Sequence, residues 1–116
     1  MSLTPMQVEK RLVDLTKEVD EAHKDLISAE QVYHTSKASL EISMARSRMA
    51  VSHPDFKLTS VQREDQALIE NAEQHMQLAL AEAQVKGARA NANRIRTQVD
   101  IARSISVSVR ASMEIA

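Results

Sequence analysis

The scarcity of helix-breaking residues constrains the fold of this chain most. Its 116 residues include one glycine and two prolines, and neither type occurs between Pro5 and Pro54. Tryptophan is absent, and phenylalanine and tyrosine occur once each. Aromatic side chains normally provide the largest single burials of a core, so this chain must rely on many small contacts between helices. We therefore expect an all-α protein that forms one domain over residues 1–116.

A coiled-coil seam is visible in the first half of the chain. Thr4 can cap free backbone N–H groups, and proline is tolerated at the first helical position, so a helix should begin at Pro5. Apolar side chains then recur at alternating spacings of four and three residues: Val8, Leu12, Leu15, Val19, Ala22, Leu26, Ala29 and Tyr33. This alternation is typical of a helix that packs along another helix. We predict a helix over residues 5–50.

A bend and a second helix follow. Pro54 disfavours helical geometry at the residue before it, which predicts a bend over residues 51–60. Thr59 and Gln62 have the spacing of a capping box, so a second helix should cover residues 61–112. Residues 104–110 also alternate with strand period, but the helical sequence around them favours helix. A stripe of mostly small residues should let another helix approach closely: Leu68, Ala72, Met76, Ala79 and Ala83.

Charges are distributed in blocks that favour an antiparallel arrangement. The net charge is −3 in residues 1–30, +3 in residues 31–63, −5 in residues 64–83 and +4 in residues 84–116. If the second helix folds back on the first, residue i lies near residue ~(110 − i), and each acidic block meets a basic one. The sequence therefore predicts a long antiparallel, coiled-coil-like helical hairpin.

The end of the second helix carries an apolar stripe that a hairpin does not readily cover. In a two-helix hairpin each helix packs against the other through one face, and the coiled-coil seam already occupies that face. The extra stripe consists of Ile101, Ile105, Val109 and Met113. Because exposed apolar patches mark interfaces, we expect these residues to join copies of the chain into a homo-oligomer.

Catalytic and metal-binding motifs are missing from the sequence. A single glycine leaves no phosphate-binding loop, and there is no cysteine. The four histidines are far apart in sequence, and only the run from Asp20 to His23 approaches a carboxylate–histidine metal motif, without the second copy that such a site needs. We expect no enzyme activity, no metal and no cofactor. No signal peptide or membrane-spanning run is found, which favours the cytoplasm and no membrane partner.

Basic residues gather around the predicted bend and form the candidate DNA-binding site. They are Lys37, Arg46, Arg48, Lys57 and Arg63. Nearby serine hydroxyls could also donate to phosphate oxygens. The alternative is that these cations pair with the acidic residues at the start of the second helix, such as Glu64, Asp65 and Glu70.

The region around the bend resembles the UvsY recombination mediators of T-even-like phages. Members of that family are small helical proteins with a basic Lys-Ala-Arg-Leu element before a short turn. Here Arg46-Ser-Arg48-Met49 stands in that place, after Tyr33-His-Thr-Ser-Lys37 and before Ser52-His-Pro54. Ala50-Val51-Ser52 replaces the acid and the aromatic pair that follow the family's element. The final helix, with Ile95, Val99, Ile101 and Ile105, resembles the family's oligomerising tail, so the resemblance covers roughly residues 22–113.

The resemblance implies a ring-like homo-oligomer that binds single-stranded DNA in the cytoplasm of the host cell. It also implies two protein partners, a recombinase and the single-strand-binding protein that the recombinase displaces. A ring would multiply a few phosphate contacts into useful affinity. The alternative function is a coiled-coil adaptor or scaffold, such as a phage assembly or host-interaction factor, that does not bind nucleic acid.

Overall fold

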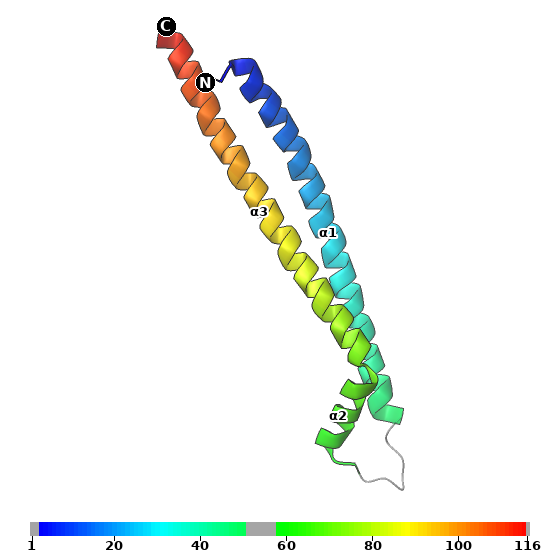
Figure 1. Cartoon of the computed structure of the whole chain (residues 1–116). Helices are drawn as coiled ribbons and strands as arrows, with labels where there is room; N and C mark the ends of the chain where they lie inside the picture. Colours follow the sequence, from blue (N-terminus) through cyan, green and yellow to red (C-terminus); the bar gives the residue numbers. More distant parts are fainter. Residues whose placement is uncertain (1–2, 51–57, 116) are drawn as a thin grey trace. The chain divides into compact units, whose positions relative to one another are not determined.

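The computed structural model describes residues 3–50 and 58–115, which form three α-helices and no strand (Figure 1). Helix α1 spans Pro5–Ala50, α2 spans Ser60–Glu70, and α3 spans Ala72–Ile115. The prediction of an all-α fold is confirmed, and residues 104–110 are helical despite their alternating pattern. Most of the predicted bend, residues 51–57, lies outside the described residues.

Helices α1 and α2 begin with the same capping arrangement. The Thr59 backbone N–H donates to Gln62 Oε1 at 3.0 Å, and the Gln62 N–H donates to Thr59 Oγ1 at 3.2 Å. Thr4 and Gln7 repeat this exchange with the same two distances. Each box satisfies two backbone donors that the first turn would otherwise leave free. The box at Thr59 was predicted from the sequence, whereas the part that Gln7 plays at the start of α1 was not.

Removing the cap of α2 should lower the stability of the protein measurably. We expect Thr59→Ala to reduce the free energy of unfolding by about 1 kcal/mol, because the Gln62 N–H then loses its acceptor. Urea unfolding followed by circular dichroism measures the change. Ser60→Ala, at the next exposed position, is the control and should have a smaller effect. Equal losses in the two variants would mean that the hydroxyl of Thr59 does not act as a cap.

Asn71 separates α2 from α3, which the sequence prediction had treated as one helix. Its backbone, with φ −110° and ψ 23°, leaves the helical range. The side chain is buried, at 5% exposure, and Nδ2 donates to the Ala67 carbonyl at 2.7 Å and to Ser47 Oγ at 2.9 Å. Because a buried amide is costly without such partners, these bonds hold Asn71 in place between α2 and α1.

The chain divides into two compact units. The first comprises Met1–Ile27 and Lys86–Ala116, and the second Ser28–Val85. In the first unit the start of α1 and the end of α3 run alongside each other in opposite directions (Figure 1). Arg11 Nη2 donates to Gln98 Oε1 at 3.4 Å between the two helices, close to the predicted pairing of residue 11 with residue 99. The buried side chains of this unit are Val8, Leu15, Ala22, Ile95 and Ala102.

In the second unit the end of α1 packs with α2 and the start of α3. Leu40 from α1, Ala67 from α2, and Ala81 and Val85 from α3 are buried. The buried seam is more polar here than in the first unit, because it includes the buried Asn71, which bonds to Ser47. Ser47 therefore meets Asn71 and not residue 63, so the predicted pairing of residues does not hold near the bend.

The seam of α1 agrees with the sequence prediction, but the predicted stripe of the second helix does not. All eight predicted seam residues of α1 are buried or half-buried. The predicted stripe, in contrast, is exposed at every position, and none of its members belongs to the buried core: Leu68, Ala72, Met76, Ala79 and Ala83. The residues of α3 that pack against α1 in the second unit lie on another face, which includes Ala81 and Val85.

Candidate functional site

An open apolar groove of about 800 Å³ lies in the first unit, where the end of α3 meets the start of the chain. Its apolar lining comes from Leu3, Pro5, Ile101, Ile105, Val109 and Met113. Ile101 is 56% exposed and Met113 is 61% exposed, while Ile105 and Val109 are half-buried. Exposed apolar side chains that gather along one groove are typical of an interface.

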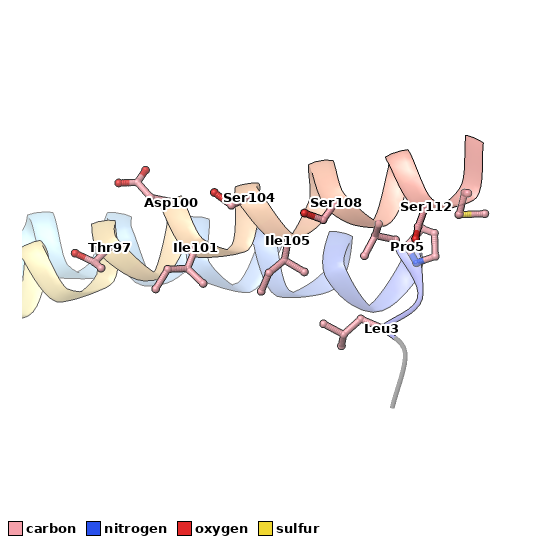
Figure 2. A pocket seen from close by; sticks show the side chains of 11 residues that line it. Leu3, Pro5, Thr97, Asp100, Ile101, Ser104, Ile105, Ser108 and Ser112 are labelled. Atoms are coloured by element: carbon pink, nitrogen blue, oxygen red, sulfur yellow. The ribbon is translucent and has the colours of Figure 1, made fainter. Parts of the chain in front are cut away.

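Two rows of side chains run along this part of α3. Figure 2 shows Ile101 and Ile105 projecting side by side toward the side on which Leu3 lies. Ser104 and Ser108 lie on the other side of the helix ribbon in the same view, one turn apart. Because residues four apart lie above one another on a helix, the apolar row and the serine row are parallel. Small hydroxyl side chains in the second row leave room for a helix to approach closely.

The structure brings together all four residues predicted for self-association, since they line one groove. The sequence prediction missed the contribution of Leu3 and Pro5, which lie about a hundred residues earlier in the chain. It also missed the row formed by Ser104, Ser108 and Ser112. The regular spacing of these serines by four residues was a signal that could have been noticed.

The predicted DNA-binding cations are not brought into one continuous track. Lys37 and Arg46 are both on α1, but they lie nine positions apart. At about 100° per residue they point to opposite sides of the helix. Lys57 lies outside the described residues.

Arg48 and Arg63 do share a hollow, of about 540 Å³, in the second unit. Glu64 and Asp65 line the same hollow, and Arg48 Nε lies 3.5 Å from Glu64 Oε1. Arg63 is half-buried, and its buried Nε has no hydrogen-bond partner. Two carboxylates therefore balance two guanidinium groups here, as the alternative of pairing with the acidic block predicts.

Neither a cluster of metal-ligating side chains nor a membrane-spanning helix is found among the described residues. In that part of the chain no three histidine, aspartate or glutamate side chains gather as a metal site would require. No helix there combines the length and apolar character needed to cross a membrane.

The geometry of the first unit thus provides an uncovered apolar groove, and that of the second unit provides a hollow of mixed charge. Comparison of the chain with protein-family models, with curated proteins and with solved structures finds no match.

Proposed function

We propose that this protein assembles with copies of itself through the apolar groove of the first unit and binds single-stranded DNA as an oligomer. The observation that supports assembly best is the exposure of Ile101 and Met113 beside the half-buried Ile105 and Val109. Covering a large apolar side chain contributes about 1.5–3 kcal/mol. Four such residues along one groove therefore favour association with a helix of a second copy of the chain.

The DNA-binding part of the proposal comes from the basic residues near the bend and from their resemblance to the UvsY mediators. In this proposal the oligomer presents single-stranded DNA to a recombinase, in the cytoplasm of the host cell, and helps it displace the single-strand-binding protein. The recombinase would supply the nucleotide chemistry. This chain would supply phosphate contacts and their repetition around the oligomer.

A specific observation favours a second candidate function. Arg48 pairs with Glu64, and Asp65 lines the same hollow. The basic residues near the bend therefore have a structural role within the chain. A coiled-coil adaptor or scaffold requires only this structural role of the basic residues and no contact with nucleic acid. Native mass spectrometry with and without oligo-dT separates the two candidates: the mediator gives an oligomer that gains the mass of the strand, whereas the scaffold gives an oligomer of unchanged mass.

If the bend contacts phosphates, the double variant Arg46→Ala/Arg48→Ala should bind oligo-dT more weakly, whatever the base sequence. The slope of log affinity against log salt should flatten by about 0.7 for each phosphate of the single strand that the variant no longer binds. Fluorescence anisotropy at several salt concentrations measures this slope. Helix content and oligomer mass should stay as in the parent, because both positions lie outside the apolar seam. An unchanged slope in a folded double variant would exclude the bend as a DNA contact.

A further inference from the structure

Arginine recurs every seven residues along α3 in the first unit. Arg96, Arg103 and Arg110 are all exposed, and Arg89 begins the same series. Seven residues make almost two helical turns, so these side chains lie on one side of the helix about 10.5 Å apart along its axis. We name Arg96, Arg103 and Arg110 the arginine stripe.

Two members of the arginine stripe, Arg96 and Arg103, border α1 where α1 offers mostly uncharged side chains. Arg96 and Arg103 line a hollow of about 340 Å³ with Thr16, Val19, Val99 and Asp100. Arg96 also lines a neighbouring hollow, together with His23 and Asp20. In the part of the chain that the structure describes, none of the three arginines forms an ion pair, in contrast to Arg11 and Arg48. The stripe therefore has positive charge that the surrounding protein does not neutralise by direct contact.

The position of the stripe indicates what kind of ligand it suits. Ile101 lies two residues before Arg103, about 200° around the helix, so the apolar groove and the stripe face in different directions. Basic residues help a helix to bind a membrane surface or an acidic partner helix when they flank its apolar face, whereas basic residues on the opposite side of the helix point away from that surface. Val107 is exposed next to the stripe, but a single valine does not make an apolar face. A ligand that is recognised by its regularly repeated charge alone, such as a phosphate backbone, fits these observations better.

We propose that the arginine stripe binds the phosphate backbone of a nucleic-acid strand, as a second contact surface apart from the bend. This inference rests on the proposed function, because it assumes that the protein binds single-stranded DNA. Contacts made only to phosphates give affinity without sequence preference and a strong dependence on salt. Asp100, which shares the hollow of Arg96 and Arg103, lowers the local positive potential.

The proposal is tested by measuring how variants of the stripe and of a control surface bind fluorescein-labelled oligo-dT. Arg96→Gln/Arg103→Gln/Arg110→Gln should lower the salt slope by about 2, at about 0.7 per phosphate contact. If the electrostatic contribution vanishes near 1 M salt, this slope corresponds to an affinity loss of about 100-fold at 0.1 M salt. Asp100→Asn alone should tighten binding, because it removes a repelling charge. The triple Arg→Lys variant should keep most of the parent slope, which separates loss of charge from loss of fold.

The chain offers a matched control on α1. Lys10, Lys17 and Lys24 recur in the same unit at the same spacing of seven residues, and Asp14 and Glu21 lie one turn from them as Asp100 and Glu114 lie one turn from the arginines. Lys10→Gln/Lys17→Gln/Lys24→Gln removes the same total charge. It should weaken binding much less than the arginine variant does. Equal losses of affinity in the triple Arg→Gln and the triple Lys→Gln variants would mean that net charge alone governs binding, and would overturn the assignment of the stripe.

The remaining outcomes separate this inference from the proposed function. If the parent binds oligo-dT and the arginine variant binds equally well, the stripe is excluded while the proposed function stands. If the parent does not bind oligo-dT at low salt, both fail. If the parent instead binds phosphatidylserine vesicles, and the arginine variant loses that binding, the stripe is a lipid contact and its assignment to nucleic acid is wrong.

Discussion

Replacing Ile105 by aspartate should dissociate the proposed oligomer into monomers. Ile105 lies near the middle of the apolar groove, between Ile101 and Val109, so its side chain would be covered in an assembly through this face. A carboxylate there would be buried without a partner, which costs several kcal/mol at each interface. Light scattering coupled to size exclusion measures the mass directly. The helix signal in circular dichroism should change little, because Ile105 is only half-buried in the single chain.

Val107→Asp provides the control for this experiment. Val107 belongs to the same stretch of α3 and is 67% exposed, but it does not line the groove. The aspartate should be tolerated there, and the mass should equal that of the parent. A monomeric parent at tens of micromolar would exclude assembly through the groove. Dissociation of both variants would instead indicate that added charge, and not the groove, determines the mass.

The sequence predicted the buried face of the first helix better than that of the second, because apolar and polar residues are more clearly separated in the first. In α1, leucine and valine alternate with charged residues, so the 3–4 spacing identifies one face, and that face is the packed one. Around the start of α3, alanine occurs on several faces at once. An alanine contributes little apolar area, and its position therefore says little about which face is buried. The exposed Ala79 and the buried Ala81 show how a stripe of similar residues was assigned to the wrong side.

The break at Asn71 was missed for a related reason. Asparagine is common near helix ends, but a single asparagine between helix-favouring residues does not identify a boundary. What fixes Asn71 is its bond to Ser47, which is 24 residues away in the sequence. A contact of this kind depends on how the helices pack, and local sequence patterns do not contain that information.

The two candidate interfaces differ in how far the sequence could identify them. Apolar residues such as Ile105 are costly to leave in water, so an unused stripe on a helix is a strong signal, and the structure gathers its members in one groove. Charged residues are stable on any exposed surface, whether or not they bind a partner. Proximity of Arg46, Arg48 and Arg63 in the sequence therefore did not predict which of them would meet a carboxylate. The regular spacing of Arg96, Arg103 and Arg110 became informative only when the side chains across from them were known.

Leu15→Ala should cause the largest loss of stability of any single truncation to alanine in the first unit. Leu15 is its most completely buried side chain, at 1% exposure, in a seam that otherwise includes small residues such as Ala22 and Ala102. Truncating a buried leucine costs about 2–5 kcal/mol, because the transfer energy of the removed atoms is lost and a cavity remains. The total stability of a protein of this size is only about 5–15 kcal/mol. Urea unfolding at one fixed protein concentration measures the change, since association would make stability depend on concentration.

Val13→Ala distinguishes the packing contribution of Leu15 from effects of the helix itself. Val13 lies two residues earlier in α1 and is 57% exposed, so its truncation removes little packed surface. Alanine also favours helix more than valine does, by up to about 0.6 kcal/mol. We therefore expect Val13→Ala to be neutral or slightly stabilising, while Leu15→Ala lowers the urea midpoint clearly. Similar midpoints for the two variants would mean that packing of the α1 seam does not hold the first unit together.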